Sequence, residues 1–158
     1  AIGGLSVGET KDIMNHFVEF TAPLLPQNKP RYLMGVGTPE DLLNGIKSGV
    51  DMFDCVMPTR NARHGSFFTW QGKRNIKIKE FEDDHSPLVE GCNCYACRNH
   101  SKAYIRHLWR LGESTAATLL SIHNIQFLVE FSQQCRQAIL EDRFGDFYNE
   151  HYRNMFNN

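Results

Sequence analysis

The chain has 158 residues, 41% of them hydrophobic, and its formal net charge at pH 7 is −1. This length and composition fit one ordinary globular domain. No run approaches the roughly eighteen apolar residues that a membrane span needs, and no charged and then apolar leader opens the chain, so we expect a soluble, cytoplasmic protein with no membrane partner.

The first 60 residues predict strands that alternate with helices. The runs "AIGGLSVGE" and "IMNHFVEFTAPLL" indicate a strand and a helix, and "RYLMGVG" indicates the next strand. In "TPEDLLNGIKSG", Thr38 is the expected N-cap, Pro39 the first helical residue and Gly49 the end of the helix. A further apolar run spans residues 50–57. Near-continuous apolar strands that alternate with helices predict the parallel sheet of an α/β protein.

The number of these units bears on the size of the protein. Three strand–helix units are too few to close a barrel. The chain also opens on Ala1, without an initiator Met. From these two observations we expect a fragment of a longer protein.

The pattern changes after Arg60. The segment "SFFTWQGKRNIKIKEF" alternates apolar and polar residues around Gln71 and Gly72, which predicts an antiparallel hairpin. A loop and a cluster of cysteines follow. Two helices, at roughly 100–111 and 114–142, are expected to close the chain.

Charge is unevenly distributed along the chain. The segment from Arg60 to Arg110 holds ten Lys and Arg against five Asp and Glu, whereas the rest holds seven against thirteen. A basic middle third is typical either of a solvated face or of a surface that binds a polyanion such as nucleic acid. Both interpretations remain open at this point.

Three of the five cysteines lie within six residues, in "CNCYAC". Such clustering in a cytosolic chain favours a metal over a disulfide, and Zn²⁺ bound by Cys92, Cys94 and Cys97 needs a fourth ligand, usually an imidazole. Spacing alone leaves His100, His107 and His123 as candidates. With four protein ligands the zinc would be structural, one ion per chain.

Asp54 lies inside the apolar run "MFDCVMPTR", where we expect a buried strand. A carboxylate near the C-terminal end of a parallel strand is a typical catalytic position. It can act as a nucleophile at the anomeric carbon of a sugar, or it can cap the following loop or pair with Arg60 or Arg63. The two arginines, expected on a loop, suit phosphate oxygens of a nucleic acid.

Four segments together resemble the bacterial tRNA-guanine transglycosylases, also called queuine tRNA-ribosyltransferases. They are "GGLSVGE", "RYLMGVG", "GVDMFDCVMPTRNARHG" and "CNCYACRNHSKAYIRHL…HN", in the order of the family, and the resemblance runs from Ala1 to about Phe147. It implies the C-terminal part of a (β/α)₈ TIM barrel, the last three βα units, with an inserted zinc-binding subdomain. The implied division is barrel units at 1–60, the zinc-binding insert with hairpin and helices at 61–125, and closing helices at 126–158.

The resemblance implies an activity in queuosine biosynthesis. The family replaces the wobble guanine in the anticodon loop of tRNA by a 7-deazaguanine through a covalent enzyme–RNA intermediate. By similarity, Asp54 is the nucleophile at ribose C1′, and Arg60 and Arg63 contact the anticodon loop. The implied zinc ligands are Cys92, Cys94, Cys97 and His123.

A base-binding site is implied as well. Backbone groups of Gly4 and Leu5 would hold the incoming base and Glu9 would support the Leu5 peptide. Tyr32 and Met34 would sandwich the base between them. Val7 is the bacterial-type residue, which implies the precursor preQ1 rather than queuine. Members of the family are commonly homodimers with the zinc region near the interface.

The family's general acid/base aspartate, and the Asp and Gln that read the base, belong to barrel strands outside these residues. We therefore expect these 158 residues alone to lack turnover. The alternative is a zinc-stabilised tRNA-binding or non-catalytic partner module in which Asp54 is structural. The intact context "FDCVMPTR" favours the enzyme.

Overall fold

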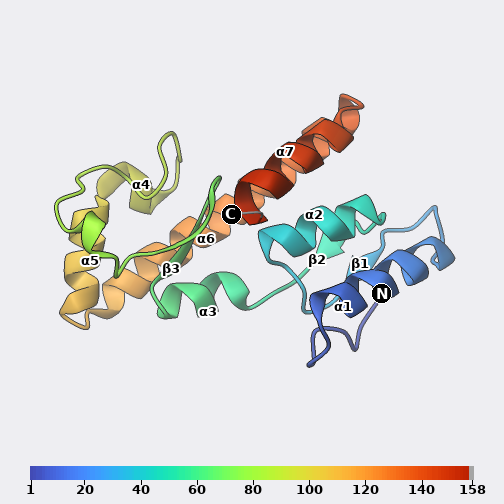
Figure 1. Ribbon diagram of the computed structural model, residues 1–158, viewed down its shortest axis with the longest axis horizontal. Helices are drawn as coiled ribbons and strands as arrows, with labels where there is room; N and C mark the ends of the chain where they lie inside the picture. Colours follow the sequence, from blue (N-terminus) through green and yellow to red (C-terminus); the bar gives the residue numbers. More distant parts are fainter. Residues whose placement is uncertain (157–158) are drawn as a thin grey trace.

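The computed structural model describes residues 1–156 and has a mixed α/β fold (Figure 1). Its helices are α1 (Lys11–Thr21), α2 (Pro39–Lys47), α3 (Met57–Arg63), α4 (Tyr95–Asn99), α5 (Lys102–Arg110), α6 (Ser114–Leu140) and α7 (Phe144–Phe156). Its strands are β1 (Tyr32–Leu33), β2 (Met52–Phe53), β3 (Ser66–Thr69) and β4 (Gly72–Asn75), and two 3₁₀ turns are η1 (Ala22–Leu24) and η2 (Lys79–Phe81). None of the helices described is both long enough and apolar enough to cross a membrane.

A small parallel sheet joins the first segments of the chain. β1 pairs with β2 in parallel, with Tyr32 opposite Met52 and Leu33 opposite Phe53. Ile2 forms a parallel bridge with Leu33, and its N–H donates to the Tyr32 carbonyl at 2.7 Å. The predicted parallel arrangement is confirmed over these three segments, although each covers only one or two residues.

The local signals for α2 are confirmed as well. The Thr38 hydroxyl accepts from the Asp41 N–H at 3.3 Å, and the Asp41 carboxylate accepts from the Thr38 N–H at 3.2 Å, with Pro39 in the first turn. This reciprocal capping satisfies two helix N–H groups that otherwise have no partner in the helix. Asp41 also forms an ion pair with Lys11, which ties α1 to α2.

The predicted hairpin is β3 and β4, with Thr69 paired with Gly72 across the turn. The Thr69 hydroxyl donates to the Gly72 carbonyl at 2.7 Å and accepts from the Gln71 N–H at 3.2 Å. Gly72 has a φ of 103°, and a Cβ there would lie 2.8 Å from the Met155 carbonyl oxygen. Glycine is therefore required at this corner, against which α7 packs.

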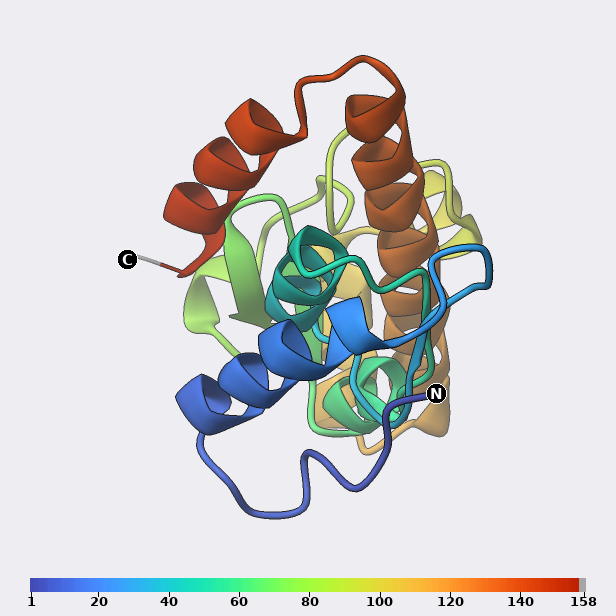
Figure 2. The ribbon, with the colours of Figure 1, turned by 90° about the vertical axis from the view of Figure 1, so that its right-hand side faces the viewer.

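Helix α6, 27 residues long, is the central element. In Figure 1 it runs from the α4–α5 end of the molecule toward α7, and in Figure 2 α7 turns back beside the hairpin.

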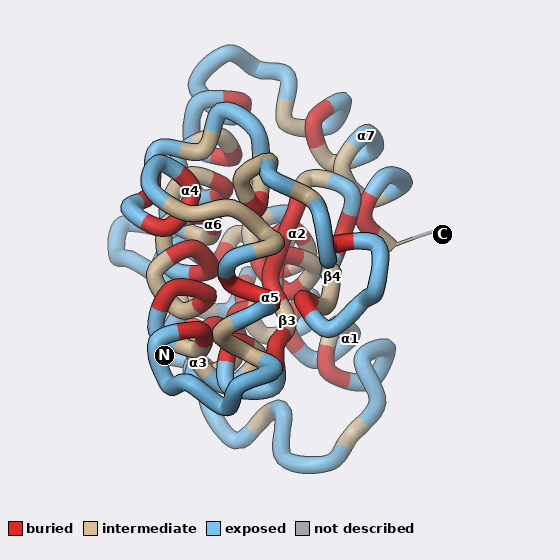
Figure 3. The backbone as a smooth tube through the Cα atoms, turned by 90° about the vertical axis from the view of Figure 1, so that its left-hand side faces the viewer, coloured by how far each residue is buried: buried red, intermediate tan, exposed pale blue. Residues whose placement is uncertain are grey.

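Buried residues gather inside, around β3 and α6 (Figure 3). One core cluster lies under the cysteine loop, around Phe67, Ile76, Ile105 and Leu120. The other two lie under α7, around Leu43, Phe127, Phe131 and Phe147, and beside the parallel sheet, around Val18, Leu33, Val36 and Val50.

The interpretation of residues 50–57 as one buried strand is wrong. Strand β2 ends at Phe53, Asp54 is exposed, and Met52 and Val56 are 51% and 58% exposed. The apolar pattern does not mark a continuous buried strand, because Met52 and Val56 stay largely in contact with solvent. Asp54 therefore needs no compensating buried partner, because it stays in contact with solvent.

The expected loop carrying Arg60 and Arg63 is instead helix α3. Pro58 occupies its first turn, where a missing N–H costs no helical hydrogen bond. The Arg60 N–H donates to the Val56 carbonyl at 2.9 Å. Both arginines are exposed and lie in the last turn of the helix, where positive charge is favourable.

Candidate active site and metal centre

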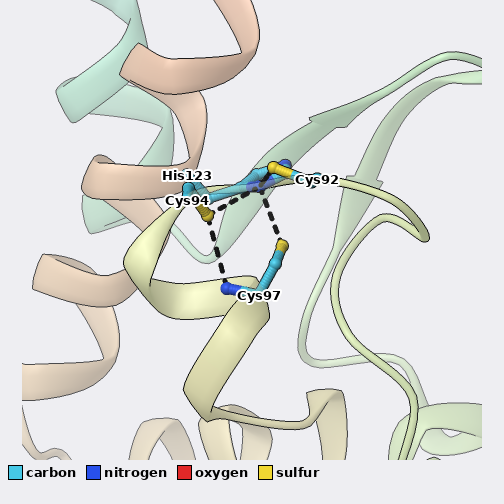
Figure 4. A group of neighbouring side chains, drawn as sticks. All are labelled: Cys92, Cys94, Cys97 and His123. Carbon is cyan, nitrogen blue, oxygen red and sulfur yellow. Dashed lines mark hydrogen bonds between the residues drawn. The ribbon is translucent and has the colours of Figure 1, made fainter.

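The cysteine cluster meets one histidine from a distant helix. Cys92 precedes α4, Cys94 is its N-cap, Cys97 lies within it, and His123 comes from the middle of α6 (Figure 4). Their ligand atoms all lie within 4.8 Å of one another. Among the histidines left open by spacing, the structure brings His123 to the thiols, whereas His100 stacks on Tyr104.

The geometry of this cluster fits tetrahedral zinc. His123 Nδ1 lies 3.7 Å from the sulfurs of Cys92 and Cys94 and 3.3 Å from that of Cys97. Bond lengths of about 2.3 Å to sulfur and 2.0–2.1 Å to nitrogen place tetrahedral S···N neighbours about 3.6 Å apart. Three thiols and an imidazole are also the donors that zinc prefers, so these four residues can hold the ion.

The opposite ring nitrogen of His123 fixes the orientation of the imidazole. Nε2 lies 2.8 Å from the Phe68 carbonyl oxygen on β3. Because a carbonyl only accepts, Nε2 carries a proton and donates to this oxygen, and Nδ1 is the nitrogen that faces the thiols. The Phe68 carbonyl was not expected from the sequence as part of this site.

Protons are distributed unequally over the cluster. The hydrogen bond from Cys97 lowers the pKa of Cys94 to about 4, and the same bond, together with burial, raises the pKa of Cys97. Burial acts to lower the pKa of His123, but its bonds with Cys92 and Cys94 outweigh this and raise it to about 9. A cation that binds here takes thiolates and a neutral imidazole, so its binding releases protons.

Asp54 is held by two donors from the neighbouring strand β1 and its exit. The Tyr32 hydroxyl donates to Asp54 Oδ1 at 2.7 Å and the Gly35 N–H donates to the same oxygen at 2.8 Å. First the Gly35 bond and then the Tyr32 bond lower the pKa of Asp54. The bond to the carboxylate correspondingly raises the pKa of Tyr32.

The second oxygen of Asp54 is available for chemistry. Among residues 1–156, Oδ2 accepts no hydrogen bond, and neither Arg60 nor Arg63 pairs with the carboxylate. The expected alternative, in which Asp54 caps its own loop or pairs with these arginines, is therefore wrong for the described residues. An ionised carboxylate with one anchored and one exposed oxygen is suited to act as a nucleophile.

A cleft of about 630 Å³ opens beside this carboxylate. Its walls come from β2 and the residues after it, including Phe53, Asp54 and Cys55, and from α6, including Leu128 and Val129. The sulfur of Cys55 accepts from the Met57 N–H at 3.3 Å. Two carboxylates, those of Asp51 and Asp54, thus line a cleft whose other walls are mostly apolar.

The glycine-rich segment at residues 3–9 lies next to β1. The Met34 N–H donates to the Ile2 carbonyl at 2.9 Å, and a Cβ on Gly3 would lie 3.3 Å from Met34 Sδ, so glycine permits this close approach. Gly4 has a φ of 77°, Leu5 is half-buried, and Met34 is 46% exposed.

Glu9 folds this segment back on itself. Its carboxylate accepts from the N–H of Ser6, which belongs to the Leu5–Ser6 peptide, and from the Val7 N–H at 3.1 Å. Backbone hydrogen bonds lower the pKa of Glu9. Val7 is 81% exposed. The expected contact between Glu9 and the Leu5 peptide is therefore present.

The Gly35 N–H, which donates to Asp54, is a site group that the sequence did not predict. The sequence Gly-Val-Gly at residues 35–37 signals only the end of strand β1.

Comparison with known proteins identifies relatives. The sequence model of a family described as "Queuine tRNA-ribosyltransferase" matches residues 1–157. A queuine tRNA-ribosyltransferase of Bacillus subtilis (strain 168) is 57% identical over 152 residues, and one of Bacillus cytotoxicus is 56% identical over the same length. Each match covers 96% of this chain and 40% of the relative, so the chain spans about two fifths of the length of these curated relatives.

Proposed function

The chain belongs to the queuine tRNA-ribosyltransferase family, and from that premise we propose that the full-length protein containing it exchanges a guanine in tRNA for a 7-deazaguanine, in queuosine biosynthesis. By full-length protein we mean a chain of the relatives' length that includes these residues. The observation that carries the proposal is the exposed Asp54 carboxylate beside a cleft, with Oδ1 anchored by Tyr32 and Gly35 and no bond to Oδ2 from the described residues.

The proposed reaction has two displacements at ribose C1′. In the first, Asp54 Oδ2 attacks C1′, a C–O bond forms, the bond to the guanine nitrogen breaks, and the departing base takes a proton from a general acid. In the second, the incoming base gives a proton to that same residue, now the general base, and its nitrogen attacks C1′, so a C–N bond forms, the C–O bond to Asp54 breaks and the carboxylate is released. The general acid is assigned, by the family resemblance, to residues beyond this chain, so these 158 residues alone are proposed to be without turnover.

The proposed base site lies at the ends of the parallel segments. Tyr32 and Met34 would sandwich the base, and the backbone of Gly4 and Leu5 would hold its edge. The Glu9 contact with the Leu5–Ser6 peptide supports this, because it aligns the backbone amides and carbonyls of the segment. With Val7 exposed on the same segment, we propose preQ1 as the incoming base.

Arg60 and Arg63 are proposed to contact the anticodon loop. Their exposure on one short helix three residues after Asp54 supports this, because a nucleotide that reacts at Asp54 leaves neighbouring phosphates nearby. A structural zinc at Cys92, Cys94, Cys97 and His123 is supported by the donor set and its spacing. When bound, the ion would tie α4 to α6.

The remaining features are proposed from the family. The parallel segments at Ile2, β1 and β2 support the end of a TIM barrel at 1–60, followed by the zinc-binding insert at 61–125 and closing helices at 126–158. Residues 157–158 of that last range lie outside the described residues. We also propose a homodimer acting on tRNA in the cytoplasm.

Replacement of the nucleophile tests the reaction. In the full-length protein, Asp54→Asn removes the nucleophilic carboxylate, so no covalent tRNA adduct should be seen on a denaturing gel after incubation with unmodified tRNA. Asp51→Asn is the matched control, since Asp51 is a second carboxylate of the same cleft whose Oδ2 accepts from the Arg31 N–H at 2.7 Å. An adduct of wild-type intensity in Asp54→Asn would refute the assignment.

A zinc-stabilised tRNA-binding or partner module remains the second candidate. The observation in its favour is that the core under the cysteine loop includes Ala62 of α3, the helix that carries the exposed Arg60 and Arg63. Binding of tRNA without any adduct by the full-length protein would support this second function and contradict the first.

A further inference from the structure

Asn124 is a fully buried polar side chain that the proposed chemistry does not use. It lies on α6 directly after the zinc ligand His123. Its Nδ2 donates to the Pro58 carbonyl at 2.9 Å and to the Ser66 carbonyl at 3.1 Å. Its Oδ1 accepts from the Phe68 N–H at 3.0 Å. One side chain therefore joins α6, the first turn of α3 and strand β3.

These three bonds use the main capacity of the amide. Both N–H donors have partners and the oxygen has one, so the side chain has a single orientation with no donor left unpaired. An aliphatic side chain here would leave the Phe68 N–H without this partner. The arrangement points to a specific requirement for Asn on a helix face that is otherwise packed with Leu120 and Phe127.

The nucleophile and the proposed RNA-binding helix are anchored separately. Asp54 is held by Tyr32 and Gly35, both on the β1 side. Helix α3 begins at Met57, and its first turn is held by Asn124 through Pro58. A change at Asn124 can therefore displace α3 and its arginines while the contacts of Asp54 stay in place.

The zinc ligand and Asn124 share strand β3. His123 Nε2 donates to the Phe68 carbonyl, and Asn124 accepts from the N–H of the same residue. The two adjacent side chains on α6 thus form hydrogen bonds with both backbone groups of Phe68 on β3. Because Asn124 also bonds Pro58, helix α3 is connected to the segment of α6 that carries His123.

We infer that Asn124 is a positioning residue for tRNA: it fixes α3 against α6 so that Arg60 and Arg63 meet the RNA backbone next to Asp54. The assignment of the arginines to RNA rests on the proposed function. The inference adds a residue outside the cleft and the metal site whose contribution is to substrate binding rather than to bond exchange.

Steady-state kinetics of the full-length protein separate this role from a general loss of folding. Asn124→Ala should raise KM for tRNA roughly tenfold, the size expected for misplaced phosphate contacts, with kcat within about twofold of wild type. Gln137→Ala is the matched control, because Gln137 is an exposed amide on α6 whose Nε2 donates to Glu141 Oε1 at 2.7 Å. It should leave both constants unchanged.

A residue that only stabilises the fold would behave in the opposite way. It would reduce the fraction of active enzyme, so apparent kcat would fall while KM stayed at the wild-type value. That result would overturn the inference. Combining Asn124→Ala with Arg60→Ala and Arg63→Ala sharpens the test, since a residue that acts through the arginines should have little further effect on KM once they are gone.

A second variant and a second measurement cover poor folding of Asn124→Ala. Asn124→Asp keeps the oxygen that accepts from Phe68 but loses the donors to Pro58 and Ser66. Amides of residues 57–63 should then exchange with solvent faster than in wild type, with zinc still at one ion per chain. Wild-type exchange in this helix would overturn the positioning role. If the wild-type protein did not exchange bases in tRNA, the proposed function would be refuted instead. The amide hydrogen-exchange data would still decide whether Asn124 positions α3.

Discussion

Removal of His123 is the sharpest test of the metal centre, because the sequence left three histidines open as the fourth ligand. His123→Ala deletes the nitrogen that faces three sulfurs at 3.3–3.7 Å. It also leaves the buried Phe68 carbonyl without the Nε2–H donor. We expect the protein to bind zinc far more weakly and the loop around α4 to lose its attachment to α6.

The size of the effect follows from the four-ligand geometry. Structural zinc sites with four ligands bind with about 10–16 kcal/mol at pH 7. An equal share for each ligand is about 2.5–4 kcal/mol, which corresponds to roughly a hundred- to thousandfold weaker binding. Competition with a chelator of known affinity, followed by metal analysis of the purified full-length protein, measures this directly.

His107→Ala is the matched control. His107 is exposed on α5 and takes no part in the ligand cluster, although spacing alone admitted it. This variant should keep one zinc per chain and the wild-type affinity. Wild-type zinc affinity in His123→Ala, or zinc loss in His107→Ala, would refute the assignment of the fourth ligand.

Three further predictions concern the nucleophile, the RNA contacts and the core of the full-length protein. The bonds from Gly35 and Tyr32 lower the pKa of Asp54, so adduct formation should persist above that lowered pKa and be lost as pH falls through it. Tyr32→Phe should therefore move the acid limb of the pH–rate profile to higher pH, and an unmoved limb would contradict the role of the hydroxyl. In Arg60→Ala, the slope of log affinity for tRNA against log salt should become shallower by about one unit if a phosphate contact is lost; an unchanged slope in filter binding would argue against that contact. Phe131→Ala, at a fully buried site, should lower the free energy of unfolding by about 3–5 kcal/mol in urea titration, whereas Leu140→Ala, 67% exposed, should change it by less than about 0.5 kcal/mol.

Local signals predicted the local elements well. The capping residues Thr38 and Pro39 define the start of α2, and the turn at Gln71 and Gly72 defines the hairpin, because both depend on neighbours within a few residues. The three cysteines were recognisable as candidate metal ligands for the same reason. His123 was not separable from His100 and His107 by spacing, because its place beside the thiols depends on how α6 packs against α4.

Burial was harder to predict than element type. The run around Asp54 has the composition of a buried strand, yet only Met52 and Phe53 pair with a neighbour, and Met52 and Val56 are largely exposed. An apolar pattern states which residues can be buried, but the elements that cover them decide which are. The same limit applies to Arg60, whose loop-like context became α3 because α6 and β3 provide a surface for Pro58 and Ala62.

The two exposed sites to which we assign function, Asp54 and the arginine pair, are supported in different ways, and this has consequences for how variants should behave. The carboxylate of Asp54 depends on donors from β1, so changes at Tyr32 should act on its ionisation and on the rate of bond exchange. The arginines depend on α3, whose Pro58 carbonyl accepts from Asn124 of α6, the neighbour of the candidate metal ligand His123. Loss of zinc should therefore weaken tRNA binding more than it alters the pKa of Asp54. His123 is connected to α3 by the hydrogen bonds of Phe68 and Asn124, whereas Asp54 is held from the β1 side.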